Sequence, residues 1–73
     1  MNIEIEQSAK FLAELVKTNR SDAVEKAKHE RDTLCCRYWL EIDQTASQLA
    51  ETFSKIAPSN NLAELMRQAI LNP

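Results

Sequence analysis

Histidine and cysteine are the residues of this sequence most able to bind a metal ion. The chain has 73 residues, and they include one histidine, His29, and two cysteines, Cys35 and Cys36. On a helix, His29 and Cys36 would share one face two turns apart, but a structural zinc site needs four ligands, commonly in two pairs. Adjacent cysteines are also poorly placed to form a disulfide with each other. We therefore expect reduced thiols, no metal and no cofactor.

The sequence contains no strong catalytic motif. The sequence has no HExxH pattern of zinc hydrolases, and its lack of glycine excludes a glycine-bearing nucleophile turn. The single histidine lies within the charged run Glu25–Asp32. Acidic and basic residues interleaved in this way are typical of an exposed helix face whose side chains pair with one another. We expect no enzymatic activity and no small-molecule substrate.

The segment 46–70 has the helix, turn, helix order of small DNA-binding proteins. A recognition helix beginning near its middle would present side chains of types that contact base edges, namely Asn60, Asn61, Glu64, Arg67 and Gln68. From Tyr38 onward, however, Lys55 and Arg67 are the only cations against four acidic residues. Contacts with phosphates need positive charge, so the sequence does not favour a nucleic-acid partner.

Composition favours a small helical protein. Apolar residues make up 44% of the chain and charged residues 27%, and the net charge is −2. Glycine is absent, and it is the usual residue of hairpin turns, phosphate loops and left-handed helix caps. No apolar run approaches the roughly 20 residues that cross a bilayer, and the N-terminus lacks the basic region of a signal peptide. We expect an all-α cytoplasmic protein with no membrane contact.

Two boundaries divide a single predicted domain, 1–73. Asp22, followed three residues later by an acidic residue, has the form of an N-terminal capping pair. Pro58 disfavours helical dihedrals at the residue before it. Between them, 22–57 contains neither glycine nor proline, which predicts one long central helix of roughly 54 Å. Shorter helices are predicted on either side, over 3–17 and 61–71.

A competing interpretation divides the central helix near Ile42–Thr45. Thr45 and Gln48 have the spacing of a second capping box, which would begin a new helix there.

The second half of the central segment carries the strongest pattern, a coiled-coil spacing of apolar side chains. The seam consists of Cys35, Trp39, Ile42, Ala46, Leu49, Phe53 and Ile56. Two short helices folded back as hairpins cannot cover it, so we predict a twofold dimeric bundle. Its long helices would meet through Tyr38, Trp39, Ile42, Ala46, Leu49 and Phe53. If the chain's own helices cover the seam, a monomeric bundle results instead.

These features predict a non-enzymatic homodimer that acts through contacts with an unidentified protein, as an adaptor, inhibitor or regulatory accessory protein. The short, glycine-free chain also suggests an origin in a bacteriophage or mobile element. The charged run Glu25–Asp32 and the outer face of the last helix are the surfaces left for a partner. A helix-turn-helix transcriptional regulator using 46–70 is the alternative function.

Overall fold

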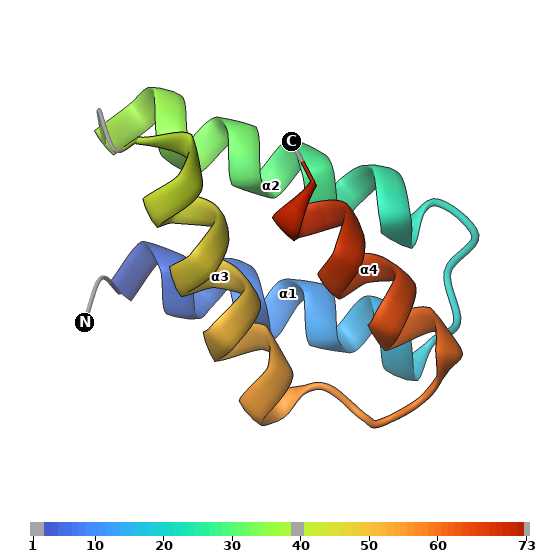
Figure 1. Ribbon diagram of the computed structural model, residues 1–73. Helices are drawn as coiled ribbons and strands as arrows, with labels where there is room; N and C mark the ends of the chain where they lie inside the picture. The colour runs from blue at the N-terminus through green and yellow to red at the C-terminus, as the bar shows by residue number, and fades with distance from the viewer. Residues whose placement is uncertain (1–2, 39–40, 73) are drawn as a thin grey trace.

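Four helices account for most of the residues that the computed structural model describes, 3–38 and 41–72 (Figure 1). They are α1 (Ile3–Lys17), α2 (Ala23–Tyr38), α3 (Ile42–Ile56) and α4 (Asn61–Leu71). No strand occurs within those two ranges. The predicted all-α class is confirmed, and α1 and α4 coincide with the two outer helices expected from the sequence.

The long central helix predicted over 22–57 is wrong, because α2 and α3 occupy that segment as separate helices. Glu41, the residue before α3, has an extended backbone with φ −63° and ψ 145°, so helical geometry does not continue through it. Trp39 and Leu40 lie outside the described residues. The competing break near Ile42–Thr45 is closer to the structure, but Thr45 is not the cap. It already belongs to the first turn of α3, where its amide donates to the carbonyl oxygen of Glu41 at 2.9 Å.

Packing explains why the chain folds back instead of forming a rod. α1 and α2 run antiparallel, and α3 and α4 run antiparallel across them (Figure 1). α3 lies mainly against α1, and α4 lies against α2 and α3. The longest dimension of the backbone is 31 Å, well short of the roughly 54 Å of an unbroken central helix. Folding back brings the apolar seam of α3 against the chain's own helices and removes it from water.

The turn between α1 and α2 is made without glycine. The Asn19 amide donates to the Val16 carbonyl and the Arg20 amide to the Leu15 carbonyl, both at 3.1 Å. These two bonds form a Schellman motif, in which the residue after the cap takes a left-handed conformation. Asn19 takes that position with φ 52°, and asparagine tolerates it better than other residues with a β-carbon.

All four helices contribute to one apolar core. Its largest fully buried apolar side chains are Ile5, Leu12, Leu34, Leu49, Phe53, Met66 and Ile70. Ala46, Leu49 and Phe53, three of the six residues predicted to form a dimer interface, are among the buried core residues of a single chain. The middle of the predicted seam is therefore covered by the chain's own helices.

Candidate functional site

Arg31 is buried, although it belongs to the charged run Glu25–Asp32 that was expected to be exposed. Its Nη1 donates to the carbonyl oxygen of Ala69 at 2.8 Å, and its Nε donates to Asp32 Oδ1 at 2.9 Å. Burial of a guanidinium requires such partners, because a desolvated charge is otherwise very costly. Arg31 therefore holds α4 against α2 and is not available to a ligand. Ala27 is buried on the same side of α2, so the run is exposed only in part.

The histidine and cysteine residues do not form a site. His29 and Cys36 are exposed on the outer side of α2, and Cys35 is half-buried. His29 Nε2 lies 3.4 Å from the hydroxyl of Thr33, one helical turn away. Within residues 3–38 and 41–72, no group of three or more histidine, cysteine or acidic side chains is placed to hold a metal ion.

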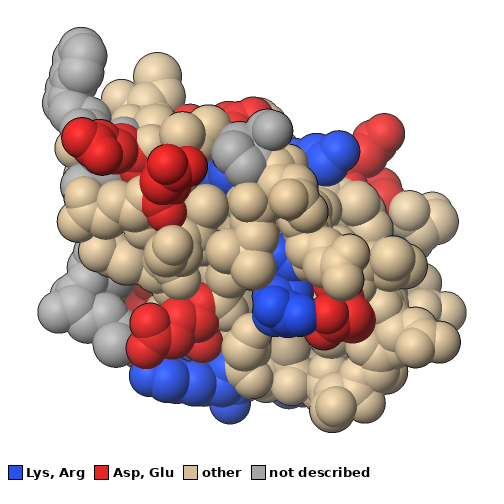
Figure 2. All heavy atoms as spheres, viewed as in Figure 1, with Lys and Arg blue, Asp and Glu red and all other residues tan. Residues whose placement is uncertain are grey.

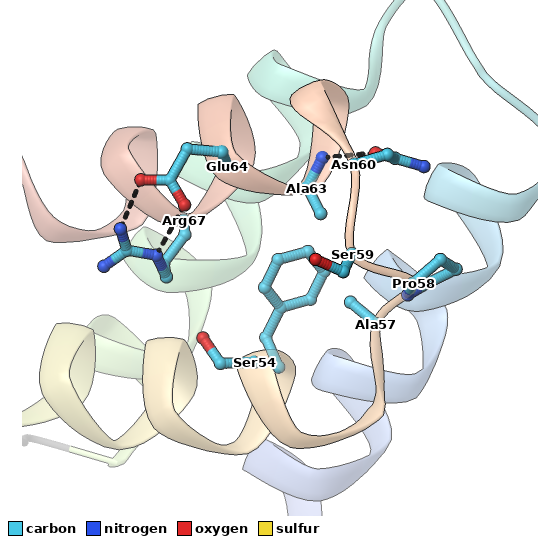
Figure 3. Close-up of a pocket in the computed structure, with 9 residues that line it drawn as sticks. Ser54, Ala57, Pro58, Ser59, Asn60, Ala63, Glu64 and Arg67 are labelled. Atoms are coloured by element: carbon cyan, nitrogen blue, oxygen red, sulfur yellow. Dashed lines mark hydrogen bonds and ion pairs between the residues drawn. The ribbon is translucent and has the colours of Figure 1, made fainter.

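A hollow of about 200 Å³ lies at the turn between α3 and α4 (Figure 3). Phe53, Ala57 and Ala63 supply apolar atoms to its lining, and the polar residues of its lining include Ser54, Ser59, Asn60, Glu64 and Arg67. Asn60 begins α4 as its N-cap, and its Oδ1 accepts from the Ala63 amide at 3.0 Å. The hollow is therefore built on a fixed helix start and combines apolar and polar surface.

Glu64 organises the polar side of this hollow. Its carboxylate accepts two hydrogen bonds from the Arg67 guanidinium, one of them from Nε at 3.1 Å, and a third from the Gln68 amide at 3.3 Å. The hydrogen bond from Arg67 lowers the pKa of Glu64 below its usual value, Gln68 adds to the effect, and Glu64 raises the pKa of Arg67. Three of the side chains predicted to read bases thus bind one another. Apart from this pair α4 carries no charge, and the α3–α4 face is mostly uncharged (Figure 2).

A second candidate surface lies at one end of the molecule, where α1 begins, α2 ends and α3 begins (Figure 1). Arg37 Nη1 on α2 lies 3.4 Å from Glu4 Oε2 on α1, so the two helix ends are adjacent. Ile3 is 67% exposed and Ile42 is 40% exposed, and Tyr38 is half-buried against the core. We call this the corner surface, and define it as Ile3, Arg37, Tyr38, Glu41, Ile42 and Asp43.

The corner surface contains two residues of the predicted interface, Tyr38 and Ile42, while Trp39 lies outside the described residues. Ile3 was not foreseen as part of it. A signal was present, because Ile3 is two residues from Ile5 and so falls off the apolar stripe of α1. No local pattern in the sequence predicts the contact between Arg37 and Glu4, because the two residues are distant in the chain.

Comparison with family models, curated proteins and solved structures finds no match for this chain. None of the helices formed by the described residues combines the length and the apolar character needed to cross a bilayer.

Proposed function

We propose that this chain is a non-enzymatic protein that acts through protein contacts and associates with itself through the corner surface. The observation that supports this most directly is the exposure of two isoleucines, Ile3 at the start of α1 and Ile42 at the start of α3, at the end of the molecule where α2 finishes with the half-buried Tyr38 (Figure 1). Apolar side chains that gather on a surface with an aromatic neighbour are typical of contact sites. The role would be that of an adaptor, inhibitor or regulatory accessory protein.

The size of the corner surface predicts weak association. Fully burying an isoleucine contributes about 1.5–3 kcal/mol, and both isoleucines here are already partly covered. A micromolar dimer requires about 8 kcal/mol in total. A standard interface covers roughly 800 Å² of each partner. That is a substantial part of the 4583 Å² that the whole chain exposes to solvent, and two isoleucines cover far less. We therefore expect a dimer that forms at micromolar concentrations and not one that is permanent.

Substitution of Ile42 tests this proposal. Ile42→Asp places a charge on the corner surface but should leave α3 intact, because an acidic residue in the first turn complements the helix dipole. Leu65→Asp is the matched control, since Leu65 is an exposed residue of α4, 56% accessible and outside the corner surface. Light scattering after size exclusion should give a monomer for the first variant and the mass of the unmodified chain for the second. A helical Ile42→Asp variant that still forms dimers would contradict the proposal.

DNA binding through α3 and α4 is the alternative, and the order of these helices with the short turn between them supports it. Against it, Glu64 engages both Arg67 and Gln68. Retention on nonspecific DNA at low salt separates the two functions. Tight binding that falls steeply as salt rises would favour the regulator, because it reports phosphate contacts.

A further inference from the structure

We propose that the hollow at the α3–α4 turn binds one aromatic ring that carries a hydrogen-bond donor, as a tryptophan or tyrosine side chain of a partner protein would. The volume of the hollow is about 200 Å³, comparable to the roughly 150 Å³ cavity that takes up benzene in an engineered protein. It therefore has room for one ring. Assigning that ring to a partner protein rests on the proposed function, whereas the binding of a ring does not.

The chemistry of the lining selects an aromatic ring over an aliphatic group. Arg67 borders the hollow, and its guanidinium is held in place by two hydrogen bonds to Glu64 (Figure 3). A planar guanidinium fixed in this way can stack on a ring face without first losing side-chain freedom. Phe53, Ala57 and Ala63 supply the apolar contacts that a ring needs.

The polar lining offers acceptors to a ring that donates a hydrogen bond. Ser54 and Ser59 place hydroxyl groups at the hollow, and Glu64 adds a carboxylate. A carboxylate accepts up to about four hydrogen bonds, and Glu64 uses three of these positions for Arg67 and Gln68. An indole N–H or a phenol O–H on the ligand matches these acceptors. The low charge of the surrounding α3–α4 face (Figure 2) agrees with a contact of this kind.

Titration of the whole chain with indole, followed by amide and methyl chemical shifts, tests the proposal. We expect saturable shifts at Ala57, Ala63 and the start of α4, with a dissociation constant in the millimolar range that suits so small a ligand. Cyclohexanol, an aliphatic ring with a donor, should bind about two- to fivefold more weakly than phenol, because it lacks the interaction with Arg67. Shifts that are absent or that map elsewhere would overturn the proposal, as would equal affinity for phenol and cyclohexanol.

Variants separate the role of the hollow from the stability of the chain. Ala63→Leu should fill the hollow and abolish the indole shifts, and Ser54→Leu, at an exposed position of α3, should obstruct them if Ala63→Leu does not fold. Arg67→Lys should weaken indole binding while the unfolding midpoint stays close to that of the unmodified chain, because an ammonium lacks the planar face. Unchanged indole binding in folded variants of these positions would contradict the site. This result would leave the corner surface and the proposed function untouched, because neither depends on the hollow.

Discussion

Arg31 on α2 donates a hydrogen bond from Nη1 to the carbonyl oxygen of Ala69 on α4, 2.8 Å away. The carbonyl oxygen of Ile70 lies 3.4 Å from the same nitrogen. Carbonyls in the last turn of a helix lack helical partners and lie at the negative end of its dipole. α4 has no basic residue in its own last turn, so Arg31 caps it from another helix.

Removal of this cap should destabilise the bundle. Arg31→Met keeps the length of the side chain but leaves the α4 carbonyls unpaired, and we expect a loss of about 2 kcal/mol, since hydrogen bonds to charged groups contribute about 1.5–3 kcal/mol. Urea unfolding measures the loss. Arg20→Met is the control, because the Arg20 side chain is 54% exposed in its contact with Asp22 and should change stability by less than about 0.5 kcal/mol. Equal effects of the two substitutions would show that Arg31 is not a cap.

Removal of each of two buried hydroxyl groups should change the stability of the chain, and the two changes should have opposite signs. Thr45 is fully buried, and its Oγ1 has no hydrogen-bond partner among the described residues, so Thr45→Val should stabilise the chain by about 1 kcal/mol. Ser8 Oγ instead donates to Glu30 Oε2 at 2.6 Å, and Ser8→Ala should cost about 1 kcal/mol. The difference in urea midpoints between the two variants is the quantity to measure. A destabilised Thr45→Val variant would mean that its hydroxyl has a partner after all.

The left-handed residue of the first turn provides a backbone test. Asn19→Gly should leave stability nearly unchanged, because glycine adopts a φ of 52° without steric cost. Asn19→Val should cost about 1–2 kcal/mol, because a β-branched residue clashes in this conformation. Thermal unfolding of both variants at one pH is sufficient. If valine is tolerated as well as glycine, the turn does not have the Schellman geometry described.

The pair of Glu64 and Arg67 predicts a small dependence of stability on pH. Arg67 lowers the folded-state pKa of Glu64 below its ordinary value of 4.5. The unfolded chain therefore binds this proton more readily, and the stabilisation is present above pH 4.5 and is lost as the pH falls through the folded pKa. Glu64→Gln should remove this part of the acid dependence. Acid unfolding curves of the two proteins that remain parallel below that pH would contradict the pairing.

Local signals in the sequence predicted the outer helices well. The boundaries at Asp22 and Pro58 set off the two outer helices, and α1 and α4 have the bounds predicted for them. Pro58 marked the end of α3, because the residue before proline avoids helical dihedrals, and Ala57 is extended with ψ 145°. Both features are local, because each depends only on residues that are close in the sequence.

Tertiary packing decided the features that the sequence did not predict. The separation of α2 from α3 contains no glycine or proline and was only the competing interpretation of the sequence; it becomes favourable because α3 can lie against α1 and α4. The burial of Arg31 depends likewise on carbonyls 38 residues further along the chain. The corner surface needed the same information, since the contact that brings the start of α1 to the end of α2 joins Glu4 and Arg37, which are 33 residues apart in the sequence.

Self-association through the corner surface is the central claim, and sedimentation equilibrium of the unmodified chain tests it most directly. Measured from low to high micromolar concentration, the mass should rise from 8.3 kDa toward twice that value. The rise should disappear in Ile42→Asp and persist in Leu65→Asp. A folded chain that sediments as a monomer of 8.3 kDa throughout this range would contradict the account.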